Sequence, residues 1–152
     1  MSVLEKVSTL GDMHTLMKEF RRLEAKLLFD FYAALQDFSS KKFLPQWLQK
    51  KSIKKVFITE NGNEILKKLN NSKRYSVIFY DLETPDLNGL QFLAELGKNP
   101  ELKSRCKVIL LIPPLKSDAQ SKLAHLGASA LIAKPFDAEG LRGAFEKIRL
   151  NY

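Results

Sequence analysis

The sequence predicts an α/β fold in which helices cover both faces of a parallel five-stranded sheet. Five short apolar runs are spaced along the chain, and segments with helical periodicity separate them. Each run is almost continuously apolar, as expected for strands that are buried on both faces. Alternating strands and helices are typical of parallel sheets, because each crossover helix returns the chain to the same end of the sheet. The predicted strands are FYAAL (31–35), KVFIT (55–59), YSVIFY (75–80), KVILLI (107–112) and ALIA (130–133).

A helical segment follows each predicted strand. In the first of them, Ser39 or Ser40 is the expected N-cap, and Pro45 is expected to shorten or kink the helix. Asn88 and Asp137 are the predicted N-caps of the third and fifth helices. The predicted helices span residues 39–51, 61–70, 88–97, 117–127 and 137–150.

Residues 1–30 precede this unit and are interpreted as an N-terminal helical extension, with residues 31–152 forming the domain. Apolar residues recur there at steps of three and four, which predicts an amphipathic helix. Its apolar face can pack on its own domain, form a homodimer with a second copy, or bind a partner helix. The residues of this face are Met13, Leu16, Met17, Phe20, Leu23 and Leu27.

Length and composition fit one globular domain of 152 residues that can bury a core. Cys106 is the single cysteine, which excludes an intrachain disulfide and fits a reducing compartment. No apolar run approaches the roughly 20 residues of a membrane span, and the N-terminus lacks the apolar segment of a signal peptide. We therefore expect a cytoplasmic protein.

The net charge of +8 is concentrated in the first half of the chain. Residues 1–76 carry 15 Lys and Arg residues against 8 Asp and Glu residues. Such a surface can meet nucleic acid, anionic lipid or an acidic protein partner, but a plain solvated surface is the favoured interpretation. Charge alone would support a nucleic-acid-associated regulator, but Trp47, which stands among these lysines, is interpreted as a core residue, and this argues against a platform on which bases stack. The basic residues are Lys41, Lys42, Lys50, Lys51, Lys54, Lys55, Lys67, Lys68, Lys73 and Arg74.

Charged residues stand at the ends of four of the predicted strands, and Glu60 is the one that follows the second strand. Asp37 follows the first strand, Asp81 ends the third, and Lys134 follows the fifth. Sites in open parallel sheets lie beyond the carboxyl ends of the strands. We therefore expect a site among the residues that follow the strands, which are Gln36, Asp37, Glu60, Asp81, Ile112, Pro113 and Lys134.

These strand ends resemble those of response-regulator receiver domains, the phospho-acceptor modules of two-component signalling. The resemblance extends over about residues 31–150 and implies the flavodoxin-like strand order 2-1-3-4-5. It rests on three segments in the expected order and spacing. They are QDFSSKKFLPQWLQKKSIKKVFITENG (36–62), VIFYDLETPDLNGLQFL (77–93) and LGASALIAKPFDAEGL (126–141).

The resemblance implies that Asp37, Asp81 and Lys134 share one pocket, and it implies a role for each of them. Asp81 would be the phospho-acceptor, whose carboxylate attacks phosphorus and becomes an aspartyl phosphate. Asp37, Asp81 and the backbone carbonyl of Glu83 would hold Mg²⁺, which neutralises the approaching anions. Lys134 would pair first with Asp81 and then with the phosphoryl oxygens.

Three positions depart from the family pattern. Gln36 stands where the family has a second acid, which implies a weakened metal site. Ile112 stands where a Ser or Thr hydroxyl would bind the phosphoryl group, and Leu131 replaces an aromatic residue that moves with that hydroxyl. These changes predict that phosphorylation shifts the conformation weakly or not at all.

Two main hypotheses follow. The first is a stand-alone atypical receiver in a phosphorelay, with no output domain after Tyr152. It would accept phosphate weakly at Asp81 from a histidine kinase or phosphotransfer protein and signal by protein contact. The second is a pseudo-receiver that docks partners independently of phosphorylation.

We do not expect an enzyme. VIFYDLETP also resembles the Asp-x-Asp-x-Thr motif of haloacid-dehalogenase-type phosphatases, but Glu83 replaces the second aspartate there. No later pair of acids follows an apolar strand, although that chemistry needs one to hold Mg²⁺. His14 and His125 lie far apart without a cysteine pair, so the chain has no zinc motif.

Overall fold

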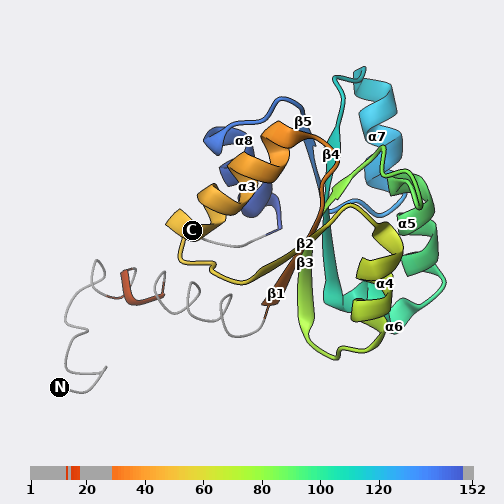
Figure 1. The fold of residues 1–152 in the computed structure, drawn as a ribbon, viewed down its shortest axis with the longest axis horizontal. Coiled ribbons are helices and arrows are strands. Elements are labelled where there is room, and N and C mark those ends of the chain that lie inside the picture. The colour runs from red at the N-terminus through yellow and green to blue at the C-terminus, as the bar shows by residue number, and fades with distance from the viewer. Residues whose placement is uncertain (1–12, 14, 18–28, 149–152) are drawn as a thin grey trace.

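The protein is described from a computed structural model, in which residues 13, 15–17 and 29–148 are placed (Figure 1). Five parallel strands form one sheet in the order β2-β1-β3-β4-β5. The predicted fold class and the strand order implied by the resemblance are therefore confirmed. The strands are β1 (Phe29–Ala34), β2 (Val56–Thr59), β3 (Tyr75–Asp81), β4 (Cys106–Ile112) and β5 (Ala130–Ala133).

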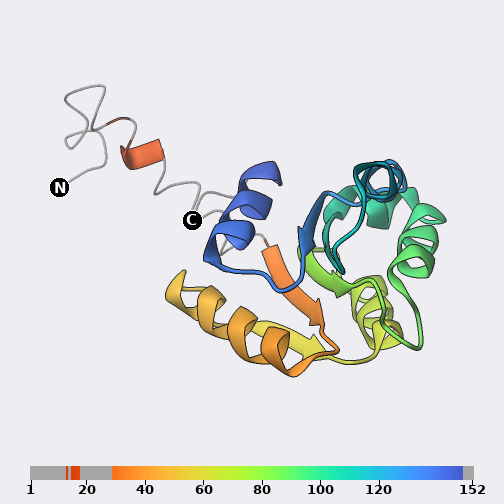
Figure 2. The ribbon, with the colours of Figure 1, turned by 90° about the horizontal axis from the view of Figure 1, so that it is seen from above.

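Helices pack on both faces of this sheet. Figures 1 and 2 show α3 and α8 against one face and α4, α5 and α7 against the other. We call these the α3/α8 layer and the α4/α5/α7 layer. The helices are α3 (Phe38–Lys50), α4 (Gly62–Asn70), α5 (Gly89–Gly97), α6 (Pro100–Arg105), α7 (Ser117–His125) and α8 (Ala138–Lys147).

The central strand β3 supplies side chains to both layers. Val77 and Phe79 belong to the core of the α3/α8 layer, whereas Ile78 and Tyr80 belong to the other core. Phe79 packs against the ring of Phe145 at 6.1 Å between centroids. This double burial explains the uninterrupted apolar run of the strand. The same strand then ends on Asp81, at the rim between the two layers.

The N-terminus of α3 differs from the prediction. Asp37, rather than Ser39 or Ser40, is the N-cap, and its carboxylate accepts a hydrogen bond from the Ser40 backbone N–H. The helix also continues through Pro45 to Lys50, so the proline does not shorten it. Proline removes one backbone hydrogen bond from a helix, but the buried side chains around it hold α3 against the sheet. These are Leu44, Trp47 and Leu48.

The other N-cap predictions are confirmed. Asn88 caps α5 in a capping box with Gln91, and Asp137 caps α8 through the backbone N–H of Gly140. The short helix α6 was not predicted. It begins at Pro100, after an N-cap at Asn99.

The described part of the N-terminal segment is helical at residues 13 and 15–17. Met13 and Met17 are exposed there. The remaining residues of the predicted apolar face, Phe20, Leu23 and Leu27, lie outside the described residues, so the helical extension and its homodimer stay predictions. The division into residues 1–30 and 31–152 also stays a prediction. No helix among the described residues is long and apolar enough to cross a membrane.

Candidate functional site

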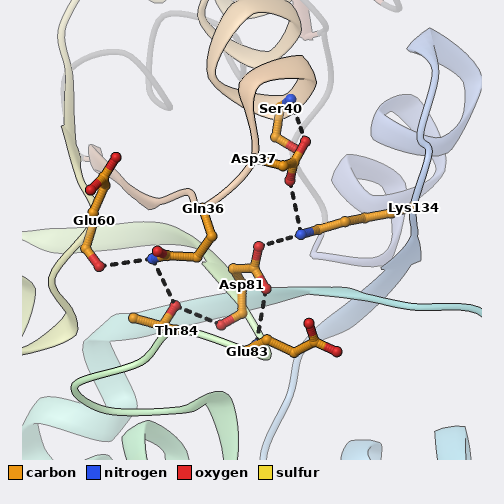
Figure 3. Close-up of polar contacts among 8 residues, drawn as sticks. All are labelled: Gln36, Asp37, Ser40, Glu60, Asp81, Glu83, Thr84 and Lys134. Carbon is orange, nitrogen blue, oxygen red and sulfur yellow. Dashed lines mark hydrogen bonds and ion pairs between the residues drawn. The ribbon is translucent and has the colours of Figure 1, made fainter.

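Three strand ends place the candidate site at one edge of the sheet. β1 and β3 pair in register up to Ala34 and Tyr80, so the residues that follow emerge together. Asp37 lies just beyond β1, Asp81 ends β3, and Lys134 follows β5. Figure 3 shows that the three side chains converge, as predicted.

Lys134 bridges the two carboxylates. Its Nζ lies 2.9 Å from Asp37 Oδ1 and also donates to Asp81 Oδ2. The Asp81 side chain is 1% exposed, whereas those of Lys134 and Asp37 are 24% and 41% exposed. Asp81 is therefore the buried member of the group, and one ammonium faces two carboxylates.

Asp37 combines this ion pair with the cap of α3. Its Oδ2 accepts from the Ser40 N–H at 2.9 Å, and its Oδ1 accepts from Ser40 Oγ at 2.8 Å. Partial burial raises the pKa of Asp37, but hydrogen bonds from Lys134 and Ser40 outweigh it and lower the pKa to about 2. Burial likewise lowers the pKa of Lys134, but its hydrogen bonds to Asp81 and Asp37 outweigh that effect and raise it. Asp37 and Lys134 are thus both charged at neutral pH.

The loop after β3 orients Asp81. The Glu83 N–H donates to Asp81 Oδ1 at 2.9 Å. Thr84 donates to the Asp81 carbonyl twice, from Oγ1 at 2.8 Å and from its N–H at 3.1 Å. Thr84 is 1% exposed, and its part in the site was not predicted. Its signal in the sequence is the Thr84-Pro85 pair, which follows Leu82 and Glu83 in the loop after the strand.

Gln36 lies in the site but points away from the carboxylates. Its Nε2 donates to the Glu60 carbonyl at 2.8 Å and to Thr84 Oγ1 at 3.4 Å. It thereby joins the residue after β2 to the loop after β3 (Figure 3). An ionised carboxylate in this position could not donate these hydrogen bonds. The amide of Gln36 therefore makes contacts that an acid would not make.

Glu83 presents its backbone, not its side chain, to the site. The side chain is exposed, and Figure 3 shows it directed away from the Asp81–Lys134 contact. Glu83 and Asp81 therefore do not form the paired carboxylates that a phosphatase motif would need.

A cavity of about 390 Å³ lies beside the ion pair. Asp37 and Lys134 line one part of it, and Phe43 and Phe136 line another. Because Lys134 lines this cavity and its side chain is 24% exposed, a small anion can approach its ammonium from there.

The two predicted switch positions are apolar in the structure as well as in the sequence. Ile112 is 1% exposed and belongs to the core of the α4/α5/α7 layer, and Leu131 packs against that core. The carbonyl of Ile112 accepts from the Lys134 N–H at 2.8 Å. The backbone of β4 therefore helps to place Lys134, but the side chain at residue 112 offers no hydrogen bond.

The oxygen atoms of the site are ligands of the type that a hard divalent cation prefers. Both carboxylates already face one cation, the Lys134 ammonium, and oxygen ligands suit Mg²⁺. Among the described residues, no group of three or more His, Cys, Asp or Glu side chains could hold a metal ion. A metal here would therefore depend on two carboxylates, backbone oxygen and water.

Comparison with known proteins identifies the fold and the family. Residues 37–146 match the response regulator receiver domain. The chain belongs to the response-regulator receiver family. It is a CheY-like receiver domain of two-component signalling, as the strand ends implied.

Individual relatives are distant. The chain is 27% identical over 110 residues to "Probable chemotaxis protein CheY" of Rhizobium etli, covering 72% of this chain and 84% of that protein. The chemotaxis response regulator CheY4 of Vibrio cholerae is similar in structure, with a TM-score of 0.68 at 20% identity over 80% of this chain and 98% of CheY4.

A third similar structure is the receiver domain of a sensor histidine kinase from Pseudomonas aeruginosa, which has magnesium coordinated in its active-site cleft. Its TM-score is 0.65 at 16% identity, over 79% of this receiver and 97% of that chain. At such low identity, the two structural comparisons establish the fold alone.

Proposed function

We propose that this receiver accepts a phosphoryl group at Asp81 from a histidine kinase or phosphotransfer protein, and that it couples this event only weakly to its conformation. The observation that carries the proposal is the convergence of Asp37, Asp81 and Lys134 at the carboxyl edge of the sheet. Signalling would then pass through protein contact.

Asp81 is the nucleophile in this proposal. One of its carboxylate oxygens forms a bond to phosphorus while the bond from phosphorus to the donor breaks, and the electron pair leaves with the donor. The Glu83 N–H and the two bonds from Thr84 hold Asp81 and its loop in place. Lys134 changes partner, from the Asp81 carboxylate to the oxygens of the attached phosphoryl group.

Asp37 and Asp81 would hold Mg²⁺, with the Glu83 backbone carbonyl as a third ligand. The metal would supply positive charge that lets an anionic donor approach two carboxylates. Gln36 adds no charge and is engaged with Glu60 and Thr84. We therefore expect weaker Mg²⁺ binding than two adjacent acids would give.

The weak coupling follows from Ile112 and Leu131. A phosphoryl group shifts a conformation only if the two states contact it differently. A hydrogen bond to a charged group contributes about 1.5 to 3 kcal/mol. That is as much as a typical allosteric coupling of roughly 1 to 3 kcal/mol. Without a hydroxyl at residue 112, this contribution is missing.

Phosphorylation with a small donor tests the nucleophile. The full chain is incubated with Mg²⁺ and acetyl phosphate, and intact-mass spectrometry follows the incorporation of phosphoryl groups. We expect slow addition of one group to the wild type and none to Asp81→Asn. Asp118→Asn changes an exposed aspartate of α7 and should label like the wild type. Equal labelling of wild type and Asp81→Asn would refute the assignment of the nucleophile.

A second candidate function is docking that does not depend on phosphorylation. It is favoured by the ammonium of Lys134, which already occupies the space between both carboxylates. If the wild type takes up no phosphoryl group while it still binds its partner, this function replaces the first.

A further inference from the structure

A second cavity lies away from the Asp81 site, along α4 and the beginnings of β1 and β2. It is an open crevice of about 970 Å³ whose lining includes none of Asp37, Asp81 and Lys134. The aromatic residues Tyr32 and Phe57 line it together with four lysines. These lysines are Lys54, Lys55, Lys67 and Lys68.

The positive charge of this crevice is not balanced within it. Its four lysines outnumber its two acidic residues. Asp30 pairs with Arg74 at 2.9 Å, and Glu64 accepts hydrogen bonds from the neutral donors Thr59 Oγ1 and Asn61 Nδ2. In residues 29–148, by contrast, no ion pair is found for Lys54, Lys55 or Lys67. A set of unpaired lysines around one crevice creates a positive potential that attracts an anionic partner.

One wall of the crevice is an edge strand. β2 is the last strand of the described sheet and pairs only with β1. The other backbone edge of an outer strand offers N–H and C=O groups with which an extended peptide can pair. Lys54 and Lys55 stand directly before this strand, so acidic side chains of such a peptide would meet them.

Nucleic acid fits the crevice less well than a peptide does. Nonspecific binding of single strands needs open aromatic faces on which bases stack. Here Tyr32 is 6% exposed, and the Lys68 ammonium lies over the Phe57 ring at 4.4 Å from its centroid. Neither ring is therefore open to a base.

We propose that the crevice between α4 and β2 binds an acidic, extended peptide segment of a partner protein. The segment pairs with the outer edge of β2, and its acidic side chains contact the four lysines. Because the lining does not include the Asp81 site, binding requires neither Asp81 nor its phosphorylation.

The test uses the full chain and a fluorescein-labelled peptide in which Glu and Asp alternate with Val. Three reference probes accompany it: the same peptide with Gln and Asn in place of the acids, an acidic peptide N-methylated at alternate residues, and a single-stranded oligonucleotide of equal charge. Fluorescence anisotropy measures each affinity, and amide spectra locate the binding surface. We expect the acidic peptide alone to bind tightly and to shift the amides of β2 and α4.

Two pairs of charge reversals test the surface. Lys54→Glu with Lys55→Glu, and Lys67→Glu with Lys68→Glu, should each weaken binding about tenfold or more, equivalent to about 1.4 kcal/mol. The control, Lys116→Glu with Lys122→Glu at α7, makes the same change of net charge and should weaken binding less than about twofold, since exposed distant charges are screened. Circular dichroism checks that each variant is folded.

Several outcomes would overturn the proposal. If the crevice variants and the control lose equal affinity for the acidic peptide, the net charge of the protein alone would explain the binding. Tighter binding of the oligonucleotide, lost in the same variants, would assign the crevice to nucleic acid. Full binding of the N-methylated peptide would exclude pairing with β2. Phosphoryl labelling of the crevice variants should equal that of the wild type, so this proposal and the one for Asp81 fail independently.

Discussion

Lys134 balances the charge of the candidate site. Asp81 is almost completely buried, and a buried carboxylate is costly unless it is paired and hydrogen-bonded. The backbone donor to its carboxylate, the Glu83 N–H, comes from its own loop, and its cationic partner comes from the far edge of the sheet, after β5. The ion pair therefore joins two distant parts of the chain.

Replacing Lys134 should destabilise the fold. Lys134→Met retains an unbranched apolar side chain but leaves Asp81 and Asp37 facing each other without a cation. We expect the free energy of unfolding at pH 7 to fall by about 1.5 to 3 kcal/mol, the contribution of a hydrogen bond to a charged group. Urea unfolding measures it, and Lys122→Met on the surface of α7 is the control. Adding Asp81→Asn to Lys134→Met should recover part of the loss, whereas additive losses would contradict this account.

The convergence of the three charged residues was predictable, but their hydrogen bonds were not. Strand ends in a parallel sheet meet at one edge, so the apolar runs placed the site among the strand ends, and the family resemblance selected Asp37, Asp81 and Lys134 there. The sequence identifies Gln36 only as a residue that replaces the second acid of the family. Its actual contacts are with the carbonyl of Glu60 and with Thr84, from segments far away in sequence. Such an orientation depends on tertiary neighbours, which sequence patterns do not contain.

At the scale of elements, the N-cap of α3 is a residue that also belongs to the site. The serines of this segment were predicted to cap the helix, but Asp37 does so. An aspartate is as good an N-cap as serine, and its negative charge also interacts favourably with the helix dipole. Ser40 instead donates to Asp37. The start of α3 and the ion pair to Lys134 are thus coupled through one carboxylate.

This coupling predicts a specific dependence of stability on pH. Since folding lowers the pKa of Asp37 from 3.8 to about 2, its carboxylate stabilises the fold above about pH 4, and the effect is lost as the pH falls through 2. Asp37→Asn retains a good N-cap but loses the charge, so stability should fall less steeply between pH 4 and pH 2. Because the side chain is 41% exposed, the loss at pH 7 should be below about 1 kcal/mol.

Urea unfolding of the wild type and Asp37→Asn at a series of pH values measures this difference. Asp37→Ala adds the loss of the cap, which should cost about 1 kcal/mol more at neutral pH. Identical pH profiles of wild type and Asp37→Asn would show that Asp37 does not carry the effect.

The apolar runs of the sequence predicted the five strands well, whereas the short polar segment that forms α6 gave no sign of a helix. All five strands were found within two residues of their predicted bounds, because buried parallel strands read as continuous apolar runs. α6 was missed because its six residues bury only Leu102, which is too little to show a helical period.

At the scale of the whole molecule, the site lies where the two packing layers meet. β3 supplies side chains to both cores and ends at Asp81, and α3 begins directly after its N-cap, Asp37. Ile112, at the end of the neighbouring strand β4, belongs to the core of the α4/α5/α7 layer. A phosphoryl group at Asp81 can influence that layer only through residues that contact it, and Ile112 has no polar side-chain atom.

Restoring a hydroxyl at residue 112 should therefore strengthen the global response to phosphorylation. Under acetyl phosphate and Mg²⁺, we expect amide shifts of the wild type to remain near Asp81, and those of Ile112→Thr to extend into α7 and β5. Because residue 112 is buried, a hydroxyl without a hydrogen-bond partner should lower the free energy of unfolding of unphosphorylated Ile112→Thr by about 1 to 3 kcal/mol. Ile112→Val removes a methylene group without adding a hydroxyl, costs about 0.5 to 1.5 kcal/mol, and should respond like the wild type. Labelled proteins with equally local shifts in all three forms would show that residue 112 does not limit the coupling.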